Sequence, residues 1–257
     1  MRFASLGSGS AGNALVVEVN VTRLLLDCGF GIKETMRRLA RLNLQPSDLT
    51  GIVLTHEHDD HAGGAYKFAA KYNLPLWLTY GTFKMSERYL PKTHQLQIHI
   101  IDSHAAFVIN DIHLQPYPVP HDAREPVQYV FSDGSHRLGV LTDVGRSTAH
   151  IEQQLKHCHA LVLECNHDAT MLQNGPYSWP LKKRVGGELG HLENLAAANL
   201  LANLDHRSLQ HVLAAHLSEK NNTPALAKSA LAKVLGCGDA WVGIADQALG
   251  FDWRAIA

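Results

Sequence analysis

The sequence has 257 residues, of which 46% are hydrophobic and 18% charged, and 23 Lys and Arg against 24 Asp and Glu leave a net charge of −1. No apolar run approaches the ~20 residues of a membrane-spanning helix, and no signal-peptide core follows the start, so we expect a cytoplasmic protein without a membrane partner. The near-neutral charge excludes a globally basic nucleic-acid-binding protein but leaves room for a local basic patch.

The apolar pattern predicts a single α/β domain over residues 1–257. Short apolar runs predict strands at 13–19, 22–29, 51–55, 76–79, 96–101, 106–109, 111–119, 127–132, 137–142, 160–165, 211–216, 240–245 and 248–253. Amphipathic stretches, the first with a basic outer face, predict helices at 31–42, 65–72, 147–157, 192–204 and from Pro224 onward. Residues 172–190 have no clear periodicity and are interpreted as a long loop.

Metal-ligand side chains gather at the end of the apolar strand GIVLT. His56, His58, Asp60 and His61 form the pattern H-x-H-x-D-H. Imidazole and carboxylate suit Zn²⁺, Mn²⁺ or Fe²⁺. Residues two apart on an extended segment share a face, so His56 and His58 can reach one ion, while Asp60 and His61 can reach a second. The pattern predicts two divalent metal ions, zinc or manganese.

This motif resembles that of the metallo-β-lactamase-fold hydrolases, whose fold is an αββα sandwich with a dinuclear metal site at the edge of its sheets. The resemblance implies a further His, an Asp and a last His, and His121, Asp143 and His216 stand in that order. It also implies two ligand sets bridged by Asp143, namely His56, His58 and His121 on one ion and Asp60, His61 and His216 on the other. A metal-bridging hydroxide would then be the nucleophile, and Asp60 would orient it.

Three further strings are similar to one branch of this family, the YycJ/WalJ-like proteins. They are SLGSGSAGNA near the start, ECNHDATML at 164–172 and HLSEKNNTP at 216–224. The resemblance covers nearly the whole chain and implies a nucleic-acid substrate and a metal-dependent 5′-to-3′ exonuclease activity on duplex DNA. Enzymes that hydrolyse β-lactams with two zinc ions usually have Cys where this chain has Asp143, so antibiotic hydrolysis is not expected.

Phosphodiester cleavage also needs a group that protonates the departing oxygen. In the related RNase Z a Glu–His pair from two later motifs has this role, and Glu164 and His191 occur here in the same order. We therefore expect His191 to be the general acid and Glu164 to raise its pKa. The alternative is that His191 merely precedes a helix.

Residues for substrate binding are harder to identify. Lys182, Lys183 and Arg184 form the only run of three basic residues and are candidates for holding a phosphate, although a solvated loop is the alternative. In the same segment Tyr177 and Trp179 could stack on a base, although as aromatic residues that pack within the loop they need no such role. Four polar residues could contact the substrate phosphate or shape the metal loops: Ser8, Asn13, Asn221 and Asn222.

Three other functions remain open at this point. A thioester hydrolase like glyoxalase II would use the same metal ligands without Glu164 and His191, because a thiolate leaves without strong protonation. An enzyme like RNase Z would act on RNA or a small phosphodiester. A metal-bound regulator without activity is the third, and the complete set of seven ligands argues against it.

Overall fold

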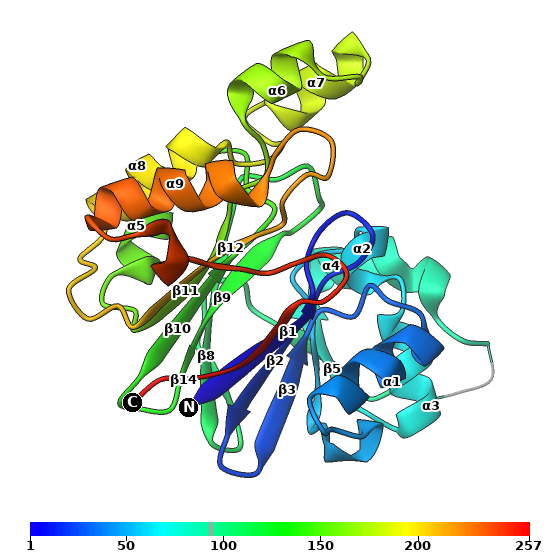
Figure 1. Cartoon of the computed structure of the whole chain (residues 1–257). Coiled ribbons are helices and arrows are strands. Elements are labelled where there is room, and N and C mark those ends of the chain that lie inside the picture. The colour runs from blue at the N-terminus through cyan, green and yellow to red at the C-terminus, as the bar shows by residue number, and fades with distance from the viewer. Residues whose placement is uncertain (93–94) are drawn as a thin grey trace.

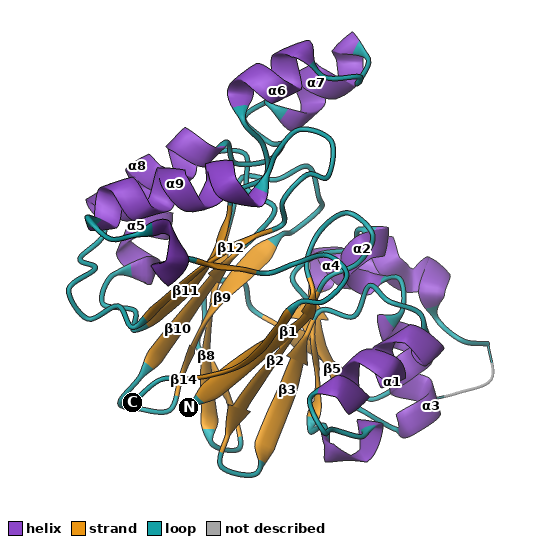
Figure 2. Ribbon diagram, in the orientation of Figure 1, coloured by secondary structure: helices purple, strands orange, loops and turns teal. Residues whose placement is uncertain are grey.

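Two β-sheets packed face to face form the centre of the molecule (Figures 1 and 2). The computed structural model describes residues 1–92 and 95–257. In this part of the chain the first sheet has the order β14 (Phe251–Ala255), β1 (Arg2–Gly7), β2 (Ala14–Val19), β3 (Thr22–Leu26), β4 (Gly51–Val53), β5 (Leu76–Thr79) and β6 (Ile98–Ile101). The second has the order β13 (Gly243–Ile244), β12 (His211–Ala215), β11 (Ala160–Glu164), β10 (Arg137–Leu141), β9 (Val127–Ser132), β8 (Ile112–Pro118) and β7 (Phe107–Ile109).

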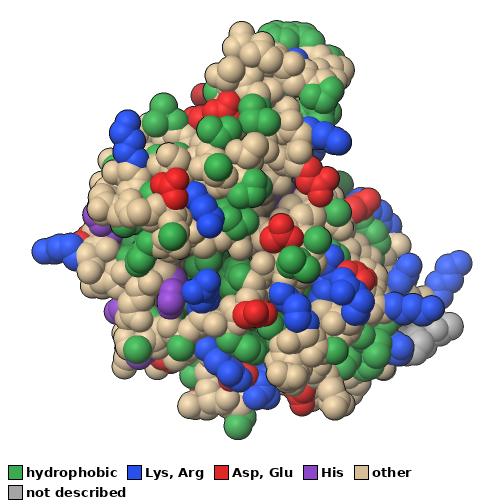
Figure 3. Space-filling model, in the orientation of Figure 1, with side chains coloured by type: hydrophobic (Ala, Val, Ile, Leu, Met, Phe, Trp, Pro, Cys, Tyr) green, Lys and Arg blue, Asp and Glu red, His purple; other side chains and the backbone are tan. Residues whose placement is uncertain are grey.

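Helices cover the outer face of each sheet (Figure 2). On the first sheet these are α1 (Ile32–Arg41), α2 (Asp59–Ala62), α3 (Ala65–Tyr72) and α4 (Tyr80–Ser86). On the second they are α5 (Ala149–Leu155), α8 (Asn194–Asn203) and α9 (Pro224–Leu235). Two short helices, α6 (Ala169–Asn174) and α7 (Trp179–Val185), project beyond the body of the molecule (Figures 1 and 3). Short 3-10 helices occupy Pro46–Asp48, Glu87–Tyr89 and Asp239–Trp241. The predicted αββα sandwich is confirmed.

Three apolar layers hold these elements together. The middle layer lies between the sheets and includes Leu24, Phe131 and Leu213. The outer layers lie between each sheet and its helices, as with Leu39 of α1 and Leu200 of α8. Because both faces of the sheets are covered, strands such as β2 are buried along their whole length, which explains the continuous apolar runs in the sequence.

Strand direction determines where the functional loops meet. Strands β3 to β6 are mutually parallel, and so are β10 to β13. Strand β8 runs in the same direction as β10, because each is antiparallel to β9. The loops after β3 and β4 therefore leave one sheet at the same edge, and those after β8, β10, β11 and β12 leave the other at the same edge. Open α/β sheets commonly bind ligands at such an edge.

Some predicted elements are wrong. Residues 172–190, interpreted as a loop, contain the end of α6 and all of α7. Strand β1 and helix α4 were not predicted, and the start of the strand expected at 240–245 is a 3-10 helix. The basic outer face of α1 also needs correction, because Arg38 is buried and donates to the backbone carbonyls of Leu6 and Gln247 at 2.6 and 2.9 Å.

The distribution of surface charge, the state of the cysteines and the character of the helices agree with the composition of the chain. Figure 3 shows basic and acidic side chains interspersed over the visible face. All four cysteines are free thiols. Among the described residues, no helix combines the length and apolar character needed to cross a bilayer. The organisation of residues 1–257 as a single domain stays a prediction.

The two sheets are joined by hydrogen bonds close to the functional edge. The Tyr129 hydroxyl of β9 donates to the Leu54 carbonyl after β4 at 3.0 Å, and the Val127 amide donates to the Thr55 carbonyl at 3.1 Å.

We expect Tyr129→Phe to lower the free energy of unfolding by about 1–2 kcal/mol in urea denaturation, because the buried carbonyl loses its donor. The exposed Tyr80→Phe variant is the control, and equal stability of the two variants would contradict this role.

Candidate metal centre

The H-x-H-x-D-H run changes backbone conformation in its middle. His56 follows β4 on extended backbone, and His58 is the last residue before α2 begins at Asp59. Asp60 and His61 lie in that short helix, so their side chains leave the backbone in a different direction from those of His56 and His58. This turn divides the run between two groups of ligands.

The first group consists of His56, His58 and His121, with one donor atom from each within 4.8 Å of the others. His58 Nδ1 lies 3.0 Å from His56 Nε2 and 3.2 Å from His121 Nε2. The second nitrogens of the two buried rings have other partners, since His121 Nδ1 is 3.1 Å from the Gly190 carbonyl and His56 Nδ1 is 3.0 Å from Thr55 Oγ1. Such contacts fix the orientation of each ring and direct its free nitrogen to the shared point.

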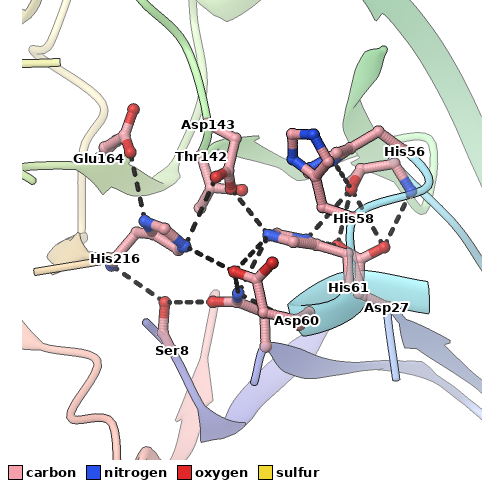
Figure 4. Close-up of polar contacts among 12 residues, drawn as sticks. Ser8, Asp27, His56, His58, Asp60, His61, Thr142, Asp143, Glu164 and His216 are labelled. Atoms are coloured by element: carbon pink, nitrogen blue, oxygen red, sulfur yellow. Dashed lines mark hydrogen bonds and ion pairs between the residues drawn. The ribbon is translucent and has the colours of Figure 1, made fainter. Parts of the chain in front are cut away.

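The second group consists of Asp60, His61, Asp143 and His216 (Figure 4). Asp60 Oδ2 lies 3.3 Å from His216 Nε2 and 3.5 Å from His61 Nε2. Asp143 Oδ2 lies 3.0 Å from His61 Nε2, whereas its Oδ1 lies 3.5 Å from His216 Nε2 and 4.0 Å from His121 Nε2. The Asp143 carboxylate therefore lies between the two groups.

The donor atoms fit metal ions better than they fit one another. In the first group the free nitrogens of three imidazoles converge. A contact between two neutral rings can hold at most one proton, so hydrogen bonds between the rings leave nitrogen lone pairs free for a metal ion. Within the described part of the chain, Asp143 Oδ2 is buried and accepts no well-aligned hydrogen bond despite its short distance to His61. Buried imidazole and carboxylate groups in this arrangement are ligands for divalent cations such as Zn²⁺ or Mn²⁺.

Asp27 is a functional residue that the sequence reading missed. It follows β3, and its Oδ2 lies 2.8 Å from His61 Nδ1 (Figure 4). Its Oδ1 accepts hydrogen bonds from the Thr55 amide and hydroxyl at 2.8 and 3.1 Å. A carboxylate on the second nitrogen of a ligand histidine fixes its tautomer and strengthens the ligand. The only signal in the sequence is an aspartate directly after the apolar run at 24–26.

Ser8 and Asn13 lie beneath the second group and connect its members. Asn13 Nδ2 donates to Asp60 Oδ2 at 3.2 Å and lies 3.0 Å from His61 Nε2. The Ser8 hydroxyl donates to Asn13 Oδ1 at 3.1 Å and accepts from the His216 amide at 3.0 Å. Of the two roles that the sequence left open, these contacts favour shaping of the metal loop.

Asn221 and Asn222 are also buried behind His216. Asn222 Nδ2 donates to the Cys165 carbonyl at 2.7 Å, and the Asn221 amide donates to Ser218 Oγ at 3.2 Å. Asn222 therefore supports the end of β11, whereas Asn221 is bonded within the loop that follows His216. A direct contact with substrate stays a prediction for these two residues.

The Glu164–His191 pair adjoins the second group. Glu164 Oε1 lies 2.8 Å from His191 Nδ1 and 3.4 Å from His216 Nδ1, while its Oε2 accepts from the Val144 and Leu192 amides at 2.9 and 3.1 Å. Burial opposes ionisation of Glu164, but the imidazoles of His191 and His216 together outweigh it and lower the pKa of Glu164 to about 2. Burial also opposes a charge on His191, yet the Glu164 carboxylate raises the pKa of His191. The pair favours a protonated imidazole at the edge of the site.

The three consecutive basic residues lie in α7 and have different environments. Arg184 Nε donates to Asp122 Oδ2 at 2.6 Å, and the other oxygen of Asp122 lies 3.5 Å from His121 Nε2. Lys182 Nζ donates to the Gln173 carbonyl at 2.7 Å. The bond from Arg184 to Asp122 thereby links helix α7 to the loop that bears His121. The Lys183 side chain is exposed.

Comparisons with known proteins agree with this geometry. Residues 22–216 match the family described as "Beta-lactamase superfamily domain". The chain is 34% identical to Exodeoxyribonuclease YycJ of Bacillus anthracis, over 94% of this chain and 93% of that protein. It is 32% identical to Exodeoxyribonuclease WalJ of Streptococcus pneumoniae serotype 2, over 95% of this chain and 91% of the relative.

A solved structure supports the same fold. The metallo-beta-lactamase fold protein YhfI from Bacillus subtilis superposes with a TM-score of 0.76 at 17% identity, over 98% of both chains. The family match and the two relatives each cover far more than half of the chain. This protein therefore belongs to the metallo-β-lactamase-fold hydrolases, in the YycJ/WalJ branch of these metal-dependent enzymes.

Proposed function

We propose that this hydrolase is a nuclease that degrades duplex DNA from the 5′ end, acting in the cytoplasm with two Zn²⁺ or Mn²⁺ ions. The names of its two relatives, both exodeoxyribonucleases, support DNA as the substrate. The observation that carries the proposal is the hydrogen-bonded Glu164–His191 pair beside the second ligand group. A thioester hydrolase would not need this pair, because its leaving group requires no strong acid.

The proposed chemistry divides between the metal ions and the side chains. Two ions held by the two ligand groups would supply a water of lowered pKa and neutralise charge on the phosphate. Asp60 would orient the attacking water with one carboxylate oxygen, while Asn13 holds its Oδ2 in place. His191 would donate a proton to the departing sugar oxygen, and Glu164 would keep that imidazole protonated and correctly turned.

Recognition of the nucleic acid would come from the basic residues of α7. Lys182 and Lys183 are close to the loop that bears His191, because the His191 amide donates to the Val185 carbonyl at the end of the same helix at 2.8 Å. Phosphate contacts of this kind fix the position of a strand without reading its sequence. Arg184 would contribute indirectly through Asp122.

The first test is digestion of a 5′-labelled linear duplex in the presence of Mn²⁺, with the Asp143→Ala variant beside the wild type. We expect short labelled products early in the reaction from the wild type alone. Asp143→Ala should abolish cleavage and lower the bound metal measured by elemental analysis, because both ligand groups adjoin this carboxylate. The exposed Asp239→Ala variant is the matched control.

Two outcomes would contradict these assignments separately. Full turnover and full metal content in Asp143→Ala would show that this residue does not bridge the ions. Absence of cleavage by metal-loaded wild type on any DNA end would refute the DNA exonuclease, and RNA and small phosphodiesters would then be the substrates to test.

The role of His191 can be tested through the leaving group. We expect His191→Ala to slow DNA cleavage by about 10²-fold or more, because the sugar oxygen leaves poorly without a proton. Hydrolysis of bis(p-nitrophenyl) phosphate should fall much less, since nitrophenolate leaves without protonation. The exposed His150→Ala variant serves as control, and equal losses on both substrates would exclude a general-acid role.

Asp27 is a positioning residue, and its contribution should appear in metal affinity. We expect Asp27→Asn to weaken metal binding by about 10- to 100-fold, because the amide cannot hold the His61 ring with a full negative charge. The measurement is a competition titration with a chromophoric chelator, which reports affinity without turnover. The exposed Asp252→Asn variant should behave as wild type, and an unchanged affinity in Asp27→Asn would remove this residue from the site.

A further inference from the structure

A cleft of about 690 Å³ lies between α6, α7 and the start of α8, outside the ligand groups. Its lining includes His167, Leu172, Trp179, Lys182, Lys183 and Gly186. Most of its wall is apolar, and the two lysines stand on the same helix as the tryptophan. In Figure 1 the two helices that form it stand at the top of the view, away from both termini.

This cleft is connected to the metal centre through the backbone of α7. The His191 amide donates to the Val185 carbonyl at the end of the helix, and Arg184 is bonded to Asp122 beside the first ligand group. On the other side His167 follows shortly after Glu164, and its carbonyl accepts from the Asn194 amide at 2.9 Å. The elements that line the cleft are therefore direct neighbours of those that carry Glu164 and His191.

The lining side chains suit a nucleotide. Trp179 is 76% exposed, and an indole in this position is a surface on which a base can stack. The buried His167 ring has its Nδ1 3.4 Å from Asn166 Oδ1, and its Nε2 lies 3.9 Å from where a Cβ on Gly186 would stand. Gly186, which has no side chain, lines the cleft beside this ring.

The charges of the cleft favour an anionic occupant. Lys182 and Lys183 line it. The Lys183 side chain is exposed, and the Lys182 ammonium keeps two further N–H groups beside the one that donates to the Gln173 carbonyl, so both can pair with a phosphate. The acidic Glu193 also lines it, but its carboxylate accepts a hydrogen bond from the Ala196 amide at 3.1 Å and caps α8. Its negative charge is thereby directed toward the positive end of a helix rather than toward the lysines.

We propose that this cleft is a subsite for one unpaired nucleotide of the substrate, with its base stacked on Trp179 and its phosphate held by Lys182 and Lys183. The inference rests on the proposed nuclease function and extends it. A duplex end would have to be opened by at least one base pair to fill the cleft. The enzyme would then prefer substrates with unpaired ends over fully blunt ones.

The test measures cleavage kinetics of metal-loaded Trp179→Ala on a labelled duplex with an unpaired extension. We expect KM to rise by about 5- to 150-fold, the range that corresponds to loss of one stacked base. Hydrolysis of bis(p-nitrophenyl) phosphate, which has no base, should be unchanged. Trp241→Ala is the matched control, because Trp241 is also exposed and does not line the cleft. The double variant Lys182→Ala, Lys183→Ala should weaken DNA binding, whereas the exposed Lys233→Ala should leave DNA binding unchanged.

Substrates with one abasic nucleotide complete the experiment. At one position in the strand, removal of the base should raise the KM of the wild type as much as Trp179→Ala does. The same substrate should not raise the KM of the Trp179→Ala variant any further. If no abasic position couples to Trp179 while the wild type cleaves DNA, the subsite is wrong and the nuclease function stands. If the wild type does not cleave DNA at all, the proposed function itself fails.

Discussion

The buried carboxylate of Asp143 is the group on which the rest of the centre depends. Burial alone would raise its pKa, but the imidazoles of His216 and His61 outweigh it and hold the pKa well below its ordinary value. A buried negative charge is tolerated only with neighbouring positive charge. This requirement explains why imidazoles from both sheets surround it, and why divalent cations would be bound at this point rather than at the surface.

The backbone adopts an unfavourable conformation at several of the residues that build the centre. Asp27, Asp143 and His216 all follow strands and all have left-handed backbone, with φ of 60, 51 and 53°. Such a conformation costs a non-glycine residue about 1 kcal/mol or more. It turns the chain sharply at the end of each strand. Asp143 and His216 then meet His61 and Asp60 from the other sheet, whereas Asp27 meets His61 after β4 of its own sheet. Hydrogen bonds such as the one from the His216 amide to Ser8 hold the turn.

Prediction from sequence succeeded where the information is local. The apolar strands are continuous because both sheet faces are covered, and the run of candidate ligands takes only six consecutive residues, His56–His61. Helix α7 was missed because its seven residues include Pro180 and the exposed Trp179, which leaves no apolar periodicity. Asp27 was missed because its partner His61 is distant in sequence. Its role depends on the pairing of β3 with β4, which no short pattern encodes.

Each ligand group combines residues that follow strands of both sheets. The first combines His56 and His58 with His121, and the second combines Asp60 and His61 with Asp143 and His216. Neither group exists until both sheets have formed and closed against each other. The second group in particular needs β12, because His216 directly follows that strand, and β12 pairs with β11 of the second sheet. A fragment that lacks β12 would therefore keep the first group of donors and lose the second.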